Sequence, residues 1–333
     1  MQEITQFTAM VVESVEDQIV FGPKQISLDD LDKGDVLIKV VYSSVNYKDM
    51  LAVQKNAGVI RNYPMIPGID LAGIVVSSEA EEFSVGQEVI VTGYEMGMSH
   101  TGGFAEYARL PHDWVVPLPE GLSMKEAMML GTAGLTAGLS VLALEEAGMA
   151  VQNAPRILVT GASGGVGSVA LAILKAAGYP NITALTRKDN QDPLVTRLGA
   201  SHIIKPEQVF LKENPLLLKG VYDYVLDTVG GDVAAHLIPQ IDYDGAISLC
   251  GNAAGIKLTT NVLPFILRGV KALGIDSVQI SHDKRCRVWE KFATDWKITD
   301  QLEVNEISLQ ELPDTILALK EGRHLGRTIV AIS

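Results

Sequence analysis

The chain contains few cysteines, and fewer basic than acidic residues. Its two cysteines, Cys250 and Cys286, are too few for a disulfide framework or a cysteine-rich zinc site, which fits a reducing compartment. Its 27 basic and 40 acidic side chains give a formal net charge of −13, so a surface that neutralises nucleic-acid phosphates is not expected. The N-terminus lacks the basic stretch and apolar core of a secretory signal, and we therefore expect a cytoplasmic protein.

Histidines at the spacing of a metal site are also missing. No His-Glu dipeptide occurs, and the six histidines (100, 112, 202, 236, 282 and 324) lie apart along the chain. Zinc sites need several His or Cys ligands at characteristic spacing. We therefore expect no bound metal, and interpret the histidines as structural or surface residues.

One uncharged run approaches the length of a membrane span. Residues 127–144 carry no charge over 18 positions, but three glycines interrupt them, and Glu126 and Glu145 bound them. These features favour a buried core helix over a membrane helix. Ser123 and Glu126 have the spacing of a capping box, which predicts the start of this helix.

A glycine-rich turn is the strongest functional signal. Residues 160–168 read Thr-Gly-Ala-Ser-Gly-Gly-Val-Gly-Ser, after an apolar run at 157–159 and before an apolar segment at 169–174. Strand, glycine turn and helix in this order are typical of a dinucleotide site, where N–H groups at the helix start meet a pyrophosphate. A tight turn without a ligand would need similar glycines, but the flanking strand and helix favour a cofactor.

The two halves of the chain differ in periodicity. Up to about residue 116, short β-rich runs predict a small barrel-like or sandwich domain. After Arg156, helices alternate with continuously apolar strands, which predicts a doubly wound parallel sheet. The tail is expected to return to the first domain through a helix at 286–295 and a strand at 328–332. The other predicted strands are 9–12, 35–42, 73–77, 88–92, 157–160, 182–185, 201–204, 222–226, 246–250 and 272–275, with helices at 167–177, 193–198 and 233–239.

The end of the strand at 182–185 bears on the choice of cofactor. In a dinucleotide fold, an Asp or Glu about 20 residues beyond the glycines binds the ribose hydroxyls of NAD. Here Arg187 lies 20 positions after Gly167, and no carboxylate follows the strand until Asp189. A guanidinium can bind the extra 2′-phosphate of NADP bidentately, so the sequence favours NADP(H). The alternative is that Arg187 is only a solvated strand end.

Two families of dehydrogenase contain a turn of this kind. The short-chain dehydrogenases carry it near the N-terminus together with a Tyr-x-x-x-Lys pair, but no Tyr of this chain has Lys four residues later. A β-rich domain, an inserted dinucleotide domain and a short return segment instead resemble the medium-chain dehydrogenase/reductase superfamily. Where its zinc alcohol dehydrogenases have Gly-His-Glu, this chain has Gly68, Ile69 and Asp70. Without zinc, no Lewis acid stabilises an alkoxide, so alcohol oxidation is not expected.

Five motifs resemble the zinc-free quinone oxidoreductase branch of that superfamily. They are Ser-Val-Asn-Tyr-Lys-Asp at 44–49, Pro-Gly-Ile-Asp at 67–70, Thr-Gly-Gly-Phe-Ala-Glu-Tyr at 101–107, Gly-Thr-Ala-Gly-Leu-Thr-Ala at 131–137 and Asp-Thr-Val-Gly-Gly at 227–231. Within this branch, residues 60–70, 263–268 and 274–278 look like the acrylyl-CoA reductase subgroup. The motifs cover almost the whole chain, and their joint order is specific.

This resemblance implies an α/β fold and a reaction. The fold has a GroES-like β-rich catalytic domain at residues 1–126 and 281–333, and a Rossmann NADP-binding domain at 127–280. The reaction is the NADPH-dependent reduction of an α,β-unsaturated acyl thioester, acryloyl-CoA to propionyl-CoA. The resemblance also implies a homodimer, in which residues 270–278 could pair with their own copy across a twofold axis.

The resemblance also assigns cofactor contacts by motif position. One departure follows the third strand of the second domain, where the subgroup tends to have a second Arg and this chain has Lys205. A lysine there acts as a point charge without bidentate binding. The implied contacts are Ser163, Gly164, Gly165 and Val166 to the pyrophosphate, Leu185, Thr186 and Arg187 to the adenosine ribose and its phosphate, Tyr47, Asn252, Ile266 and Ser277 to the nicotinamide half, and Arg327 near the cofactor.

Three residues are candidates for the chemistry. A hydride added to the β-carbon of an enoyl thioester places negative charge on the thioester oxygen, and a hydrogen-bond donor there lowers the barrier. Tyr47 is either that donor, since a phenol is protonated at neutral pH, or only packs against the nicotinamide. Asn46 either orients the carbonyl or, as we favour, caps a turn. Asp70 either holds a polar network of the site or, as is commoner, bonds to buried backbone.

Substrate and partners are less determined. Arg61 either meets CoA phosphates or is an isolated surface residue. A quinone or other enone reductase would use the same fold with a different pocket, and a non-catalytic sensor could bind NADPH without turnover, although the Asn46-Tyr47 region argues mildly against it. The expected partners are thus a small-molecule acyl-CoA or quinone and a second copy of the chain, with no nucleic acid and no membrane.

Overall fold

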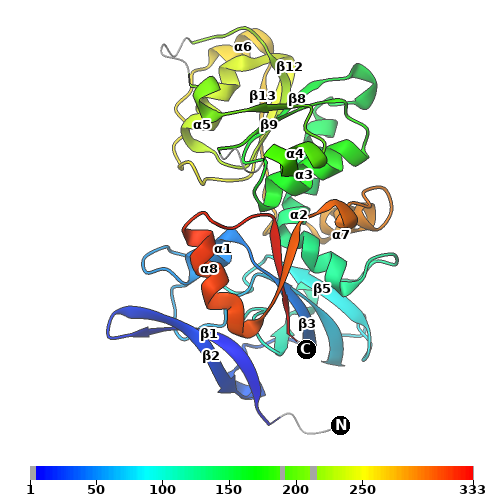
Figure 1. Ribbon diagram of the computed structural model, residues 1–333. Helices are drawn as coiled ribbons and strands as arrows, with labels where there is room; N and C mark the ends of the chain where they lie inside the picture. The colour runs from blue at the N-terminus through cyan, green and yellow to red at the C-terminus, as the bar shows by residue number, and fades with distance from the viewer. Residues whose placement is uncertain (1–4, 188–191, 211–215, 333) are drawn as a thin grey trace. The chain divides into compact units, whose positions relative to one another are not determined.

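The computed structural model describes residues 5–187, 192–210 and 216–332, which form two compact units (Figure 1). Unit 1 contains Met1–Thr132, Val278–Ala293 and Glu303–Ser333, and unit 2 contains Ala133–Ser277 and Thr294–Leu302. The predicted boundaries after residues 126 and 280 stay predictions. The chain therefore begins and ends in unit 1, and it enters unit 2 twice, the second time only for Thr294–Leu302.

Unit 1 is built on a mostly antiparallel sheet. Within the described residues, its strands follow the order β14-β15-β3-β4-β5-β7, and β6 pairs with the start of β3. Only β14 and β15 run parallel to each other. Alternate residues such as Val36, Ile38 and Val40 are buried in the core. The bounds are β3 (Val36–Ser44), β4 (Asp70–Ser78), β5 (Glu88–Thr92), β6 (Tyr107–Leu110), β7 (Val116–Pro117), β14 (Val304–Ser308) and β15 (Arg327–Ala331).

A hairpin of unit 1 is only half predicted by the sequence. β1 (Phe7–Val15) pairs along its whole length with β2 (Gln18–Ile26). The two turn residues, Glu16 and Asp17, have φ of 47° and 65°, the left-handed conformation of a two-residue hairpin turn. Neither is the Asn or Gly that usually marks such a turn, so the pattern predicts β1 alone.

The helices of unit 1 are short. α1 (Tyr47–Ala52) follows β3, and α8 (Leu312–Lys320) packs beside it through an apolar cluster that includes Met50, Leu312 and Ile316 (Figure 1). α7 (His282–Ala293) corresponds to the helix predicted at 286–295. Helices of six and nine residues contain too few turns for a clear apolar period, and the sequence predicts neither α1 nor α8.

Unit 2 is a doubly wound parallel sheet, which confirms the predicted fold class. Its strand order is β10-β9-β8-β11-β12-β13, and every neighbouring pair is parallel. Counted along unit 2, this is the order 3-2-1-4-5-6 of the dinucleotide fold, which reverses between β8 and β11. Right-handed crossovers therefore place α3 and α4 on one face and α5 and α6 on the other. The bounds are β8 (Arg156–Val159), α3 (Gly165–Ala176), β9 (Asn181–Leu185), α4 (Asp192–Arg197), β10 (His202–Ile204), β11 (Tyr222–Asp227), α5 (Gly231–Leu237), β12 (Ile241–Leu249), α6 (Leu263–Arg268) and β13 (Lys271–Gly274).

The uncharged run forms α2 (Met124–Glu146). The Ser123 hydroxyl accepts from the Glu126 N–H at 3.2 Å, and Glu126 Oε2 accepts from the Ser123 N–H at 3.0 Å, so the predicted capping box is confirmed. Among the described helices, α2 is the one that is long and apolar enough to cross a membrane, but most of it is buried. It is also divided, because Gly131 has φ 54° and ψ −155°.

Candidate functional site

Six polar side chains from distant segments of unit 1 meet where β3 ends and α1 begins. They come from the end of β3, the start of α1, the start of β4, the break in α2 and the start of β15. Five are buried, and Thr132 is half-buried. We refer to Ser44, Asn46, Asp49, Asp70, Thr132 and Arg327 as the polar cluster.

Asp70 lies at the centre of the polar cluster. Its Oδ2 accepts hydrogen bonds from the Ser44 hydroxyl at 2.6 Å, the Asn46 amide at 2.7 Å and the Thr132 N–H at 2.8 Å. Its Oδ1 accepts from the Thr132 hydroxyl at 2.5 Å. A fully buried carboxylate needs such donors to offset its lost hydration. Asp70 is thus part of a side-chain network, joined by one backbone N–H.

Arg327 supplies the positive charge of the polar cluster. Its guanidinium donates to the Ser44 hydroxyl at 3.0 Å, to Met129 O at 3.0 Å, to Val45 O at 3.2 Å and to Asn46 Oδ1 at 3.4 Å. Burial lowers the pKa of Arg327, while the Asp70 and Asp49 carboxylates oppose this. A guanidinium remains charged even so. Arg327 thus makes four hydrogen bonds to protein groups, and its contact with a cofactor stays a prediction.

Gly131 makes room for the polar cluster. A Cβ there would lie 2.5 Å from both Asp70 Oδ2 and the Ser44 hydroxyl, and the positive φ also disfavours any side chain. The first N–H after the break, that of Thr132, donates to Asp70. Asp70 therefore caps the second half of α2, where the positive end of the helix dipole favours a carboxylate.

Asp49 is a buried acid that the sequence analysis did not single out. Its carboxylate accepts from the Asn46 N–H at 2.8 Å and from the Ile69 N–H at 3.1 Å. Burial, and next the Asp70 carboxylate, raise the pKa of Asp49 to about 7. The spacing Asn46-x-x-Asp49 is that of a capping box, a signal that could have placed Asp49 inside the first turn of α1.

The three catalytic candidates have different surroundings. The Asn46 amide is engaged at both ends, since its nitrogen donates to Asp70 and its oxygen accepts from Arg327. Asn46 also occupies the N-cap of α1, and Asp70 is fully buried. Tyr47, the first residue of α1, is 48% exposed, and no group among the described residues hydrogen-bonds its hydroxyl. Tyr47 alone of the three can meet an external molecule.

The glycine turn of unit 2 lies at the point where the sheet order reverses. Gly161 has φ 57°, and a Cβ there would lie 2.4 Å from the Thr228 hydroxyl. A Cβ on Gly167 would lie 2.3 Å from Gly161 O. Both glycines thus have a packing requirement independent of any ligand. The turn leaves Ser163, Gly164, Gly165 and Val166 around the N-terminus of α3, where N–H groups favour an anion.

Asp227 anchors this turn and was not predicted to do so. Its buried carboxylate accepts from the Thr160 hydroxyl and from the Gly230 N–H, both at 2.7 Å. The Thr160 hydroxyl in turn accepts from the Thr228 N–H at 2.9 Å. Burial raises the pKa of Asp227. The loops after β8 and β11, which flank the reversal, are thereby tied together.

The basic residues predicted for the phosphate share one edge of the sheet. β9 and β10 are parallel with Leu185 opposite Ile204, so Arg187 and Lys205 both leave at the carboxyl end. The Ala162 N–H donates to Leu185 O at 3.2 Å, which ties the glycine turn to this strand end. Asp189, the first carboxylate after this strand, lies outside the described residues.

The residues predicted for the nicotinamide half have unlike surroundings. Asn252 is exposed in the loop after β12, and Ile266 on α6 is 68% exposed. Ser277 is buried, and its hydroxyl accepts from the Thr136 hydroxyl at 2.8 Å. The structure shows that these three residues all belong to unit 2. Their cofactor contacts stay predictions.

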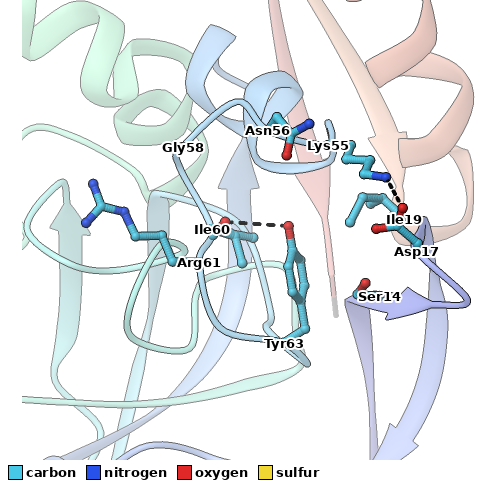
Figure 2. A pocket seen from close by; sticks show the side chains of 9 residues that line it. All are labelled: Ser14, Asp17, Ile19, Lys55, Asn56, Gly58, Ile60, Arg61 and Tyr63. Carbon is cyan, nitrogen blue, oxygen red and sulfur yellow. Dashed lines mark hydrogen bonds and ion pairs between the residues drawn. The ribbon is translucent and has the colours of Figure 1, made fainter.

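Arg61 does not join the polar cluster. It lines a pocket of about 410 Å³ together with residues of the β1–β2 hairpin and of the segment that follows α1 (Figure 2). Its side chain is exposed. The structure thus places the predicted substrate residue in a distinct depression of unit 1.

The family comparisons agree with these two units. Residues 32–120 match the model of the alcohol dehydrogenase GroES-like domain, and residues 165–294 match that of the zinc-binding dehydrogenase. A GroES-like domain combined with a doubly wound domain defines the class, a two-domain oxidoreductase. The chain belongs to the medium-chain dehydrogenase/reductase superfamily, which confirms the predicted family and enzyme class.

Individual relatives match over the full length. A Bacillus subtilis protein named as a quinone oxidoreductase, YhfP, is 44% identical over 98% of this chain and 99% of its own. Its structure, with NAD bound, has a TM-score of 0.95. The acrylyl-CoA reductase AcuI of Ruegeria pomeroyi is 40% identical over 98% of this chain and 99% of its own. The structure of the yhdH oxidoreductase of Salmonella enterica in complex with NADP is 40% identical in sequence and has a TM-score of 0.94. The match covers 98% of this chain and 100% of that one.

The name of the second family model raises the question of zinc. In the described part of the chain, no three His, Cys, Asp or Glu side chains are placed so that they could hold a metal ion together. The neighbours of Asp70 are hydroxyls, an amide and the Arg327 guanidinium network, with neither a thiolate nor an imidazole. Zinc prefers those ligands, and a fixed guanidinium nearby would repel the ion, so the residues of the polar cluster do not fit zinc.

Proposed function

We propose that the protein reduces the activated C=C bond of an α,β-unsaturated acyl-CoA, acryloyl-CoA to propionyl-CoA, with NADPH and without a metal. The observation that carries this proposal is the polar cluster, which lacks a zinc ligand set and adjoins Tyr47, a half-exposed residue next in the chain to buried Asn46. The similarity to AcuI supports the substrate. We place this activity in the cytoplasm.

The cofactor proposal is NADP(H). The pyrophosphate would lie on the N-terminus of α3 at Ser163, Gly164, Gly165 and Val166, because the first N–H groups of a helix have no partner within the helix and favour an anion. Arg187 would bind the 2′-phosphate, with Lys205 as a second positive charge at the same sheet edge. The NADP complex of the Salmonella relative supports this choice, and the NAD complex of YhfP makes the preference worth measuring.

The reaction needs one donor from the protein. When bound, NADPH supplies a hydride. Addition of the hydride to the β-carbon of the enoyl thioester would move the electron pair of the C=C bond toward the thioester oxygen. The Tyr47 hydroxyl would donate a hydrogen bond to this oxygen, and water would supply the proton that the α-carbon takes up. Asn46, hydrogen-bonded to both Asp70 and Arg327, would hold the start of α1 in place.

Tyr47→Phe tests this role. Turnover of acryloyl-CoA should fall about 100- to 1,000-fold, the typical cost of one lost oxyanion donor, while NADPH affinity changes little. Stopped-flow absorbance at the NADPH band measures the first quantity, and fluorescence titration measures the second. Unaltered turnover would remove Tyr47 from the chemistry.

A quinone or enone reductase is the second candidate, supported by the 44% identity to YhfP. Side-by-side kcat/KM values for acryloyl-CoA and small quinones separate the two. A chain that binds NADPH but oxidises it with neither class would instead be a sensor. A chelator that abolishes turnover would contradict the metal-free proposal.

We also propose a homodimer. β13 is the last strand in the described sheet order, and most of its residues are exposed. An unpaired edge invites pairing with an identical strand across a twofold axis. Sedimentation at micromolar concentration should give twice the chain mass, and a monomer would reject this assembly.

A further inference from the structure

The pocket that contains Arg61 lies between two segments of unit 1. The hairpin β1–β2 forms one wall, and the segment after α1 forms the other (Figure 2). Its volume is about 410 Å³, which lies within the range of small-molecule sites. The lining residues are Ser14, Asp17, Ile19, Lys55, Asn56, Gly58, Ile60, Arg61 and Tyr63.

The charge of this pocket is opposite to that of the chain. Lys55 and Arg61 outnumber Asp17 in the lining, whereas the chain as a whole carries −13. Asp17 pairs with Lys55 at 2.5 Å, but the Asp17 side chain is 85% exposed, so water and salt weaken this pair. Among the described residues, no carboxylate pairs with Arg61. The pocket therefore offers an anion at least one uncompensated guanidinium.

The remaining lining suits a nucleotide. Tyr63 presents a half-buried aromatic ring beside Ile60, and bases stack on such rings. Figure 2 shows the Arg61 side chain extending away from Tyr63 on one side, and the Lys55 side chain extending toward Asp17 on the other. Asn56 adds an exposed amide that can hydrogen-bond a base edge or a ribose hydroxyl. An aromatic ring for the base, and two long cationic side chains in the same lining for the phosphates, suit a nucleoside that carries phosphate on its ribose.

The pocket is also within reach of Tyr47. α1 runs from Tyr47 to Ala52, about 9 Å of helix, and Lys55 follows three residues later. The two side chains therefore start from backbone positions no more than about 20 Å apart. The pantetheine arm of a CoA ester separates its thioester from its nucleotide, so one molecule can occupy both places.

We propose that this pocket binds the adenosine 3′,5′-bisphosphate end of the acyl-CoA, which rests on the proposed function. Arg61 and Lys55 contact the phosphates, and Tyr63 stacks on the adenine. Asp17 competes with the phosphates for Lys55. The pocket thereby distinguishes CoA esters from quinones and other small enones, which have no nucleotide end.

Substitution kinetics test the pocket with two thioesters, acryloyl-CoA and acryloyl-N-acetylcysteamine, which lacks the nucleotide. Arg61→Ala and Lys55→Ala should each lower the kcat/KM ratio of the CoA ester to the short thioester about three- to tenfold. Asp17→Asn should raise this ratio. Lys24→Ala is the matched control, because Lys24 is also 48% exposed and paired at 2.5 Å, with Glu13, but lies outside the pocket.

Direct titration with a nucleotide measures binding to the pocket independently of the enzymatic activity. Adenosine 3′,5′-bisphosphate should bind NADPH-saturated wild-type enzyme, adenosine should bind far more weakly, and Arg61→Ala should weaken the bisphosphate about tenfold. The proposal is overturned if Arg61→Ala and Lys55→Ala change neither the kcat/KM ratio of the two thioesters nor the affinity for adenosine 3′,5′-bisphosphate. It is also overturned if Lys24→Ala has the same effect as these two substitutions. If neither thioester is reduced, the proposed function fails, and the titration still decides whether the pocket binds this nucleotide.

Discussion

The glycine turn of unit 2 and the polar cluster of unit 1 represent two ways of building a site. The turn occupies one short stretch, from Thr160 to Gly167, and its shape follows from glycines that no side chain could replace. The polar cluster draws on residues from Ser44 to Arg327, and buried charges and hydrogen bonds hold it together. Local backbone geometry determines the first site, and long-range electrostatics determine the second.

This difference decides how each site fails. A change in the turn alters backbone position, so it acts mainly on the ligand that the backbone would hold. A change in the polar cluster leaves a charged group buried without its partner, which costs folding free energy first. Four substitutions test this contrast.

Arg327→Ala should have the largest effect, on stability. It removes the positive charge of the polar cluster and leaves Asp70 and Asp49 buried, which should lower the free energy of unfolding by about 3–5 kcal/mol in urea titrations. Arg323→Ala is the control, since Arg323 forms an exposed pair with Glu321 and should cost at most about 1 kcal/mol. Equal losses would mean that the polar cluster does not stabilise unit 1.

Asp49 should make stability depend on pH. Its pKa is about 7 in the folded protein against 3.8 as the reference value, so between these values the folded protein retains a proton that the unfolded chain has lost. Stability should therefore fall as the pH rises through this window, by about 4 kcal/mol in total. In Asp49→Asn this contribution is absent, and the difference between the two urea profiles from pH 4 to 8 isolates it. Parallel profiles would show that Asp49 does not titrate there.

Gly167→Ala should act on the cofactor. Its Cβ would lie 2.3 Å from Gly161 O, which forces the start of α3 to move. NADPH affinity should fall about 100-fold, equivalent to about 2.7 kcal/mol, as measured by fluorescence titration. A Cβ on Gly22 meets nothing within 4 Å, so Gly22→Ala should bind NADPH normally. Retained affinity in Gly167→Ala would place the pyrophosphate elsewhere.

Arg187→Ala should have the smallest effect, confined to one phosphate. NADPH binding should weaken about tenfold or more while NADH binding changes little, because only NADPH carries the 2′-phosphate. Isothermal titration with both nucleotides measures this. Lys205→Ala should weaken NADPH less, as a point charge contributes less than a bidentate guanidinium. Equal losses for both nucleotides in Arg187→Ala would reject the phosphate contact.

The sequence predicts unit 2 better than unit 1. Continuous apolar strands and a glycine turn are local signals, and each strand predicted from 157 to 275 has a counterpart in the parallel sheet. β12 nevertheless begins earlier, at Ile241, because it continues through polar residues and shifts register against β11. In unit 1, β2, β6, β7, β14, α1 and α8 escape prediction, since their turns or lengths give no distinctive pattern.

The sequence likewise predicts some parts of the candidate site and misses others. Sequence motifs include Asn46, Tyr47 and Asp70, but not the network that engages Asn46 and Asp70 while leaving Tyr47 exposed. Asp49, Thr132 and Asp227 lie inside sequence motifs named above, but the motifs give them no role. The sequence does not show whether a polar residue is buried. The pocket around Arg61 requires the β1–β2 hairpin to pack near the segment after α1.

The sequence by itself determined the family, the doubly wound order and the glycine turn, because each depends on residues that are near neighbours in the chain. Only the tertiary structure decided which acids are buried, that Arg327 lies with Ser44, Asn46 and Asp70, and that Gly131 must lack a side chain. Those facts depend on contacts between segments up to 283 residues apart. Desolvation and packing depend on which residues are close together in space. The order of residues along the chain does not specify this closeness for segments that are far apart in sequence.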